Sequence, residues 1–195
     1  EESWLIDRQI IMGRHDDEQT LLRVDEAINK TYTRRNGAEM SISRICWDTG
    51  GIDPTIVYER SKKHGRFRVI PIKGASVYGK PVASMPRKRN KNGVYLTEIG
   101  TDTAKEQIYN RFTLTPEGDE PLPGAVHFPN NPDIFDLPEA QQLTAEEQVE
   151  KWVDGRKKIL WDRKKRRNEA LDCFVYALAA LRVSISRWAL DVSAL

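Results

Sequence analysis

Residues 4–72 alternate between strand-like and helix-like segments, and this alternation limits the possible folds more than any other feature of the sequence. Strand-forming residues predominate at 4–11, 41–47 and 67–72. Apolar residues at helical spacing predict a helix over 16–32, with acidic residues at its start. An Asp-Pro pair predicts the start of a second helix over 53–65. This order predicts an α/β fold built around a layered sheet.

The remainder of the chain predicts further elements around a proline-rich loop. Strands are expected at residues 94–99 and 125–128. A helix is expected at residues 103–112, capped by Thr101 or Asp102. Residues 73–93 are predicted to form a loop. Residues 116–138 are also predicted to form a loop, because they hold six of the ten prolines.

Two helices are predicted near the end of the chain. Thr144-Ala145-Glu146-Glu147 matches a capping box, which predicts a helix as far as Val153. Residues 169–185 carry apolar side chains on one face and predict the longest apolar helix.

The charge of the chain is unevenly distributed, although its net value is only +2. Residues 113–150 contain nine acidic residues and no Lys or Arg, whereas residues 151–167 contain nine basic residues and two acidic ones. Residues 80–91 add five basic residues without an acidic one. This segregation indicates a partner for the basic surface, and a solvated helix face is the alternative explanation.

Several classes of protein are excluded by composition. No apolar run approaches the ~20 residues that span a bilayer, and no signal peptide pattern opens the chain. Cys46 and Cys173 have no zinc spacing and are expected to be reduced, buried thiols of an intracellular protein. Three scattered histidines give no support for a histidine metal site. The length of 195 residues predicts one domain.

Asp48 is the first candidate site residue, because it ends an apolar strand and precedes Gly50-Gly51. Ligands of α/β sheets bind at the carboxyl ends of strands, and a carboxylate there is a suitable ligand for a hard cation. An Asp before a glycine turn is also ordinary turn chemistry, so both interpretations stay open.

Asp172 is the second candidate, at the edge of the apolar face of the last helix. A partly buried carboxylate needs a counter-charge, a metal or hydrogen bonds. The alternative is a boundary Asp that reaches solvent. Glu169 lies one turn earlier and either shares the site or caps the helix.

A basic series leads into this helix, with Trp152 and Trp161 interleaved. Such a series would neutralise the phosphates of a nucleic acid, and a solvated surface is the alternative. Its members are Arg156, Lys157, Lys158, Arg163, Lys164, Lys165, Arg166 and Arg167. Arg87, Lys88 and Arg89 form a second candidate phosphate contact.

Three segments resemble the C-terminal nuclease domain of tailed-phage terminase large subunits, of the phage lambda type. They are ICWDTGG at 45–51, VYLTEIGTDTAK at 94–105 and RNEALDCFVYA at 167–177. Each motif alone is moderately specific, and their order and spacing together are strongly so.

The resemblance implies an RNase H-like fold, with a mixed β-sheet between helices and an acidic cluster at one end. In that family the cluster binds Mg²⁺ or Mn²⁺ and cuts concatemeric viral DNA into genome lengths. We expect a two-metal site, incomplete in this chain if an acidic ligand is missing, because two cations can activate a water and stabilise the leaving oxygen. The family's catalytic metal ligands fall on Asp48 and Asp172, with Glu169 as a weaker addition, and Lys105 joins the basic residues above as a DNA contact. The implied partners are double-stranded DNA, the terminase small subunit and the portal or procapsid, in the cytoplasm of an infected bacterium and without a membrane.

The sequence departs from the family pattern in two respects. No residue matches the family's first acidic ligand, on its first strand, and no P-loop of its ATPase domain occurs. We therefore expect residues 1–195 to be a single nuclease domain of a larger protein, lacking its first strand and cleaving DNA poorly. If the chain itself cleaves DNA efficiently, the missing ligand would be supplied by another acid, with Asp7, Asp16 and Asp102 as candidates.

Two alternatives to a nuclease remain at this point. A non-catalytic DNA-binding or docking module would use the basic series and the last helix. An RNase H-like resolvase or transposase core is a third possibility, which the likeness at 94–105 and 167–177 disfavours.

Overall fold

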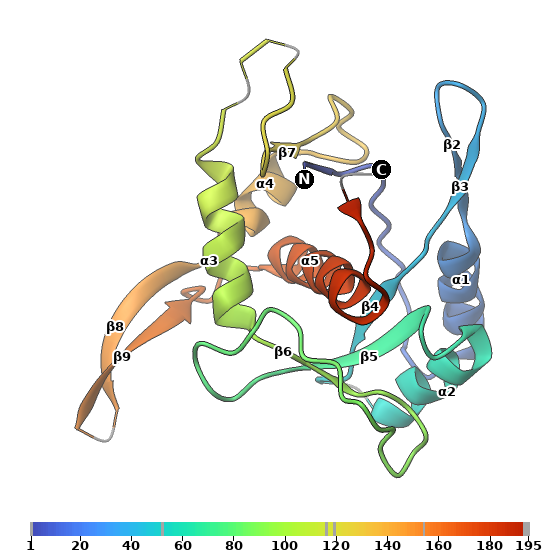
Figure 1. Cartoon of the computed structure of the whole chain (residues 1–195), viewed down its shortest axis with the longest axis horizontal. Helices are drawn as coiled ribbons and strands as arrows, with labels where there is room; N and C mark the ends of the chain where they lie inside the picture. The colour runs from blue at the N-terminus through green and yellow to red at the C-terminus, as the bar shows by residue number, and fades with distance from the viewer. Residues whose placement is uncertain (1, 52, 116, 119, 154, 193–195) are drawn as a thin grey trace.

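A three-stranded parallel sheet forms the centre of the fold (Figure 1). Its strands are β4 (Ile45–Asp48), β5 (Val69–Gly74) and β6 (Thr97–Ile99), in the order β4-β5-β6. Asp48 is paired with Ile72, and Ile72 with Thr97. The computed structural model describes residues 2–51, 53–115, 117–118, 120–153 and 155–192, except the side chains of 153, 156 and 158. Within these residues the architecture is mixed α/β, with five helices and several small sheets.

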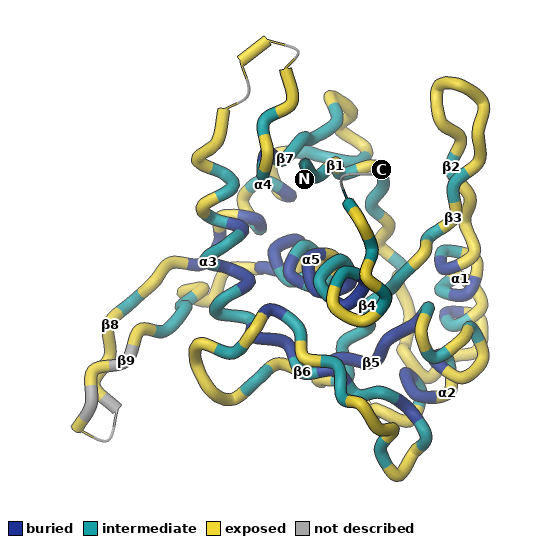
Figure 2. Tube along the Cα trace, viewed as in Figure 1, coloured by how far each residue is buried: buried dark blue, intermediate teal, exposed yellow. Residues whose placement is uncertain are grey.

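Helices cover both faces of this sheet, because alternate side chains of a strand point to opposite sides. Ile70 and Ile72 belong to a buried cluster with residues of α3 (Thr101–Phe112) and α5 (Glu169–Trp188). Val69, which precedes Ile70 on β5, lies next to α2 (Pro54–His64), whose Ser61 hydroxyl donates a 2.7 Å hydrogen bond to the Val69 carbonyl. In Figure 2 the buried part of α5 faces the sheet.

Capping side chains set two of the helix starts that the sequence predicted, but the predicted cap of α3 by Thr101 or Asp102 is wrong, because Gly100 is the N-cap residue and no side chain of the described residues caps this helix. Asp17 caps α1 (Glu18–Asn29) and Asp53 caps α2, each accepting a backbone N–H with its side chain. The predicted helix over 16–32 ends earlier, since β2 (Thr31–Thr33) follows it and pairs antiparallel with β3 (Glu39–Ser41). The last helix is confirmed, and it continues to Trp188.

The carboxyl edge of the sheet brings together segments that are distant in sequence. Asp48 ends β4 at this edge, and β6 leads through Gly100 into α3. A Cβ at Gly100 would lie 2.2 Å from the Lys80 carbonyl oxygen and 2.5 Å from that of Pro81. Glycine is therefore required here, because the loop backbone of residues 80–81 passes directly over the start of α3.

The predicted helix from Thr144 to Val153 is wrong. This segment contains β8 (Glu147–Val153), which forms an antiparallel hairpin with β9 (Arg156–Asp162). Thr144 closes the short helix α4 (Leu137–Leu143), and its hydroxyl donates to the Ala140 carbonyl instead of beginning a helix. The Asp-Gly pair at 154–155 is a typical hairpin turn sequence, although residue 154 lies outside the described residues.

Four further expectations differ from the structure. The predicted strand over 4–11 is reduced to β1 (Ser3–Trp4), paired with β7 (Val126–His127). The predicted proline-rich loop ends in α4, because Asp136 caps that helix and Pro138 occupies its first turn. The three strands of the central sheet are all parallel, and among the described residues the antiparallel pairing at this sheet is limited to a single bridge between Ser84 and Glu98 of β6. Cys173 is exposed, whereas Cys46 is half-buried.

The hairpin β8–β9 projects from the body of the molecule in Figure 1. At its base, the Trp161 ring stacks on Tyr109 of α3 with ring centroids 5.0 Å apart. No helix in the described part of the chain is long and apolar enough to cross a membrane.

Candidate carboxylate site

Asp48 lies at the carboxyl end of β4 and accepts a 3.0 Å hydrogen bond from the Gly50 backbone through Oδ1. A Cβ on Gly50 would lie 3.1 Å from the second oxygen, Oδ2. The glycine turn thus fits closely around the carboxylate and fixes it at the edge of the sheet. The turn chemistry and the strand-end position that the sequence suggested occur together at this residue.

Asp172 lies in the first turn of α5, which packs against β4. Its side chain is 36% exposed, so one part of the carboxylate is buried and another faces solvent. Tyr176 lies one turn later, where burial raises its pKa and the charges of Asp48 and Asp172 add to the effect. The charges of Asp48 and Asp172 thus act on the same tyrosine.

A buried carboxylate that the sequence did not single out completes the surroundings of Asp172. Glu146 Oε1 accepts hydrogen bonds from Lys105 Nζ and from Asn168 Nδ2, both at 2.7 Å. The same two donors approach Asp172: Asn168 Nδ2 lies 3.1 Å from Oδ2, and Lys105 Nζ lies 3.9 Å from Oδ1. We call Lys105, Glu146, Asn168 and Asp172 the carboxylate cluster.

Negative charge exceeds positive charge around this cluster. Burial raises the pKa of Asp172; Lys105 opposes this effect, and Glu146 and Asp48 add to it. The pKa of Asp102, at the start of α3, is raised by burial in the same way, with Lys105 opposing. An excess of buried negative charge is a typical feature of functional sites, because a cation or a proton must be supplied from outside.

The other acidic candidates lie apart from the carboxylate cluster or at its rim. The Glu169 carboxylate accepts a 3.2 Å hydrogen bond from Arg167 at the exposed start of α5. Asp7 accepts hydrogen bonds from Lys30 and Tyr32, and Asp16 pairs with Arg14. Of the three acids proposed to complete the site, only Asp102 lies near enough to be influenced by Lys105 and Glu146.

Lys105 was predicted as a DNA contact, and the structure instead places it inside the carboxylate cluster, where it is 9% exposed. The remaining predicted contacts are exposed on two segments. One is the turn before α5, which we call the basic turn (Arg163, Lys164, Lys165, Arg166 and Arg167), and the other is the loop carrying Arg87, Lys88 and Arg89. In the hairpin, Lys157 is exposed and pairs with Glu150, whereas the side chains of Arg156 and Lys158 lie outside the described part.

The basic turn has an unusual backbone, since Lys164 and Lys165 adopt left-handed conformations with φ of 48° and 65°. Two successive non-glycine residues in this region store strain, which is typical of functional segments. Arg163 Nη1 donates a 3.2 Å hydrogen bond to Asn168 Oδ1, so the basic turn is joined to the carboxylate cluster.

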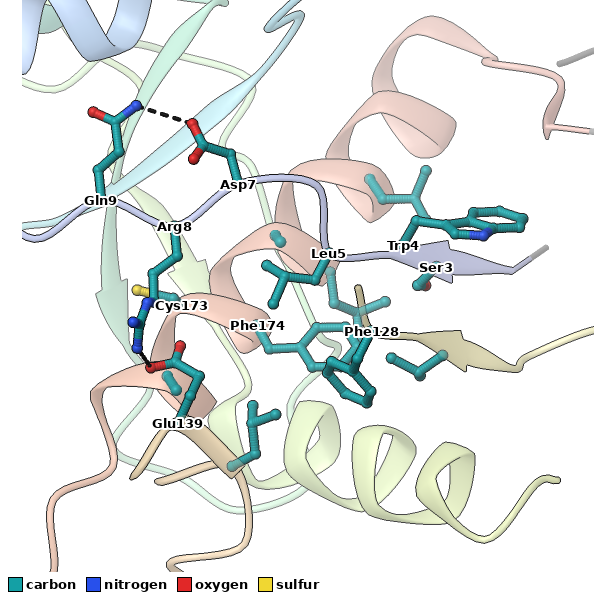
Figure 3. A pocket seen from close by; sticks show the side chains of 16 residues that line it. Ser3, Trp4, Leu5, Asp7, Arg8, Gln9, Phe128, Glu139, Cys173 and Phe174 are labelled. Atoms are coloured by element: carbon teal, nitrogen blue, oxygen red, sulfur yellow. Dashed lines mark hydrogen bonds and ion pairs between the residues drawn. The ribbon is translucent and has the colours of Figure 1, made fainter. Parts of the chain in front are cut away.

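A separate apolar pocket of about 410 Å³ lies on another face of α5 (Figure 3). It is lined by α5 residues such as Phe174 and by the N-terminal segment, where Arg8 pairs with Glu139 at 2.7 Å. Neither Asp48 nor Asp172 lines this pocket. The carboxylate chemistry therefore lies outside it.

The donor set at the sheet edge fits a hard cation in part. Among the described side chains, no three His, Cys, Asp or Glu residues lie close enough to enclose a metal ion. Asp48 and Asp172 nevertheless offer two carboxylates, and Mg²⁺ is commonly bound by one or two carboxylates together with water and substrate phosphates. Two protein ligands and a polyanionic substrate would suffice for such a site.

Comparison with known proteins gives the family of this chain. A model described as the endonuclease domain of the terminase large subunit gpA matches residues 1–188. The chain belongs to this family. It is 97% identical over 195 residues to the terminase large subunit of Escherichia phage lambda, and 64% identical over 196 residues to that of Enterobacteria phage P21. Each match covers the whole chain and 30% of the relative, so the chain spans about 30% of the length of these relatives. No solved structure matches it.

These comparisons confirm that the chain is a terminase endonuclease domain, as the resemblance of its sequence motifs indicated. Sequence reasoning missed Glu146, Asn168 and Tyr176. Asn168 and Tyr176 lie within the third motif and flank Asp172 at helical spacing, a usable signal. Glu146 had no such signal, because its partners are 41 and 22 residues away.

Proposed function

We propose that this terminase domain is a Mg²⁺- or Mn²⁺-dependent endonuclease with an RNase H-like organisation, cutting concatemeric double-stranded viral DNA into genome units. Asp48 and Asp172 would be its metal ligands. The proposal is supported by the position of Asp48 at the carboxyl edge of a parallel sheet and by the effect of its negative charge on the pKa of Asp172.

The chain's own residues support this chemistry in defined ways. Asp48 is held by the Gly50 backbone, and Asp172 is oriented by Asn168, so both carboxylates are preorganised. The exposed basic turn lies at the entrance to α5, where it would hold phosphates beside the acidic centre. A bound divalent cation would supply a nucleophilic water and stabilise the leaving oxygen of the phosphodiester.

The DNA substrate, the small subunit and the portal or procapsid are proposed as partners of the complete large subunit. Glu169 remains a weaker proposed ligand, since its carboxylate lies beside Arg167 in this structure.

Cleavage of linear DNA by a full-length terminase large subunit tests the proposal. Asp48→Asn and Asp172→Asn are each expected to reduce the cleavage rate at least a hundredfold, and EDTA is expected to abolish cleavage. Asp16→Asn is the matched control, because that exposed carboxylate pairs with Arg14 and should leave the rate unchanged. Normal cleavage by Asp172→Asn would refute the assignment.

A non-catalytic DNA-binding module is the second candidate, favoured by the exposed basic turn and by the lack of three clustered ligands among the described side chains. Salt-sensitive DNA binding without any EDTA-sensitive cleavage would support this module and contradict the nuclease.

A further inference from the structure

Glu146 occupies a position that is unusual for a carboxylate so near to proposed metal ligands. Its side chain is 5% exposed, and the hydroxyl of Tyr109 donates to its backbone carbonyl at 2.8 Å and accepts from its backbone N–H at 3.2 Å. Its backbone and its side chain are therefore both fixed. A buried carboxylate fixed in this way acts on its neighbours through the donors that it binds.

Both donors bound by Glu146 also face Asp172, but they face different oxygens. Lys105 Nζ is 2.7 Å from Glu146 Oε1 and 3.9 Å from Asp172 Oδ1. Asn168 Nδ2 is 2.7 Å from Glu146 Oε1 and 3.1 Å from Asp172 Oδ2. Glu146 thus holds the ammonium group near Asp172 but beyond hydrogen-bond distance of it.

Asn168 provides an independent sign that this arrangement serves Asp172. It is the N-cap residue of α5, a position where Asn usually accepts a backbone N–H of the first helical turn. Here its side chain makes no capping bond, and its amide donates to the two carboxylates instead. The capping bond of α5 is replaced by contacts that orient Asp172.

We propose that Glu146 is a positioning residue that prevents the Lys105 ammonium from forming a hydrogen bond with Asp172. The Asp172 carboxylate is then available to a divalent cation. The inference rests on the proposed metal-dependent function. A buried ammonium must be paired with a carboxylate, and when the charge of Glu146 is removed the nearest one is Asp172. Lys105 would then occupy the place of the cation.

Glu146→Gln tests this mechanism with little change of shape, since the amide oxygen still accepts from Asn168 while the charge that attracts Lys105 is lost. The measurement is the Mn²⁺ dissociation constant of the 195-residue chain without DNA, followed by electron paramagnetic resonance. We expect Glu146→Gln to weaken Mn²⁺ binding about tenfold, as substitutions of residues that support metal ligands do.

Removal of the lysine should have the opposite effect. We expect Lys105→Met to strengthen Mn²⁺ binding, and Glu146→Gln combined with Lys105→Met to restore the affinity to within about twofold of the wild type. Such a reversal is a coupling that a double-mutant cycle detects. If Glu146 only stabilised the fold, the double variant would bind Mn²⁺ no better than Glu146→Gln, and that result would overturn the inference.

A crystal structure of metal-free Glu146→Gln separates this inference from the proposed function. We expect Lys105 Nζ to move from 3.9 Å to within hydrogen-bond distance of the Asp172 carboxylate. An unmoved Lys105 would contradict the inference. If Lys105 moves but the wild type and Asp172→Asn bind Mn²⁺ equally or not at all, the positioning role stands and the proposed metal site fails.

Discussion

The Asp25 cluster and the carboxylate cluster use the same kinds of side chain with opposite charge balance. Asp25 is paired with Arg60, Lys63 and His64 at 2.5–2.6 Å, and it joins α1 to α2. Asp172 shares one lysine with Glu146 and lies within the influence of Asp48. Asp25 thus has three basic partners, whereas Glu146 and Asp172 share a single lysine.

The pKa values of the two carboxylates differ in the corresponding way. Burial alone would raise the pKa of Asp25, but hydrogen bonds from Lys63 and His64 and the charge of Arg60 lower it below its usual value. Burial raises the pKa of Asp172, and Lys105 does not cancel the effect. Loss of a compensated buried carboxylate leaves its partners unpaired, whereas an uncompensated one could accept a cation from outside, as proposed above. The comparison can be tested at both clusters.

The largest expected effect is on stability, at the compensated site. Asp25→Asn should lower the free energy of unfolding by about 3 kcal/mol, because it leaves three basic groups without their carboxylate. Urea denaturation of the metal-free chain measures this value. Metal binding should be unchanged, and a loss of both would show that the two clusters are not independent.

Asp172→Asn should have the reverse pattern. Because the Asp172 charge is disfavoured in the folded protein, the amide should leave the stability of the metal-free chain equal to or above that of the wild type. Mg²⁺ at ten times its dissociation constant should stabilise the wild type by about 1.4 kcal/mol and this variant not at all. Thermal denaturation with and without Mg²⁺ measures both effects, and equal stabilisation would contradict the metal assignment.

The pH dependence of stability gives a smaller difference. Since the folded-state pKa of Asp25 is lowered, its stabilising contribution is complete above the unfolded value of about 3.9 and is lost as the pH falls through the folded value. The stability difference between the wild type and Asp25→Asn should therefore shrink as the pH falls below about 4. Urea denaturation across this range is the measurement, and a constant difference at pH 3 would disagree with a lowered pKa.

The smallest expected effect concerns the exposed charges around the uncompensated site. Lys165→Gln in the basic turn should remove one phosphate contact and reduce the slope of log affinity against log salt by about 0.9. Lys62→Gln is the control, because this exposed lysine lies in the last turn of α2, away from the edge that holds Asp48. DNA binding at several salt concentrations measures the slopes, and equal slopes for the two variants would exclude the basic turn from the interface.

The hairpin at 147–162 shows where prediction from sequence failed. The pattern from Thr144 to Glu147 satisfies the capping-box rule, yet Thr144 ends α4 and Glu146 binds Lys105 and Asn168. The local pattern is compatible with the start of a helix and with the start of a strand. The packing of Trp161 on Tyr109 favours the strand. The charge of the hairpin is also balanced across its strands, as in the pair of Lys157 with Glu150.

The sequence by itself determined the features that depend on neighbouring residues. Asp17 and Asp53 cap their helices, the apolar face of α5 is buried, and Asp48 ends a strand, because capping, helical period and turn chemistry act over a few residues. The three motifs were sufficient to identify the family.

Only the tertiary structure decided which charges are compensated. In the sequence, Lys105 is simply a basic residue of a motif. Its burial against Glu146 depends on the packing of α3 beside α5 and on the position of the chain before β8. Electrostatic energy depends on distances of a few ångströms and on exclusion of water, and neither quantity follows from separation along the chain. The fold therefore sets the chemistry of this site.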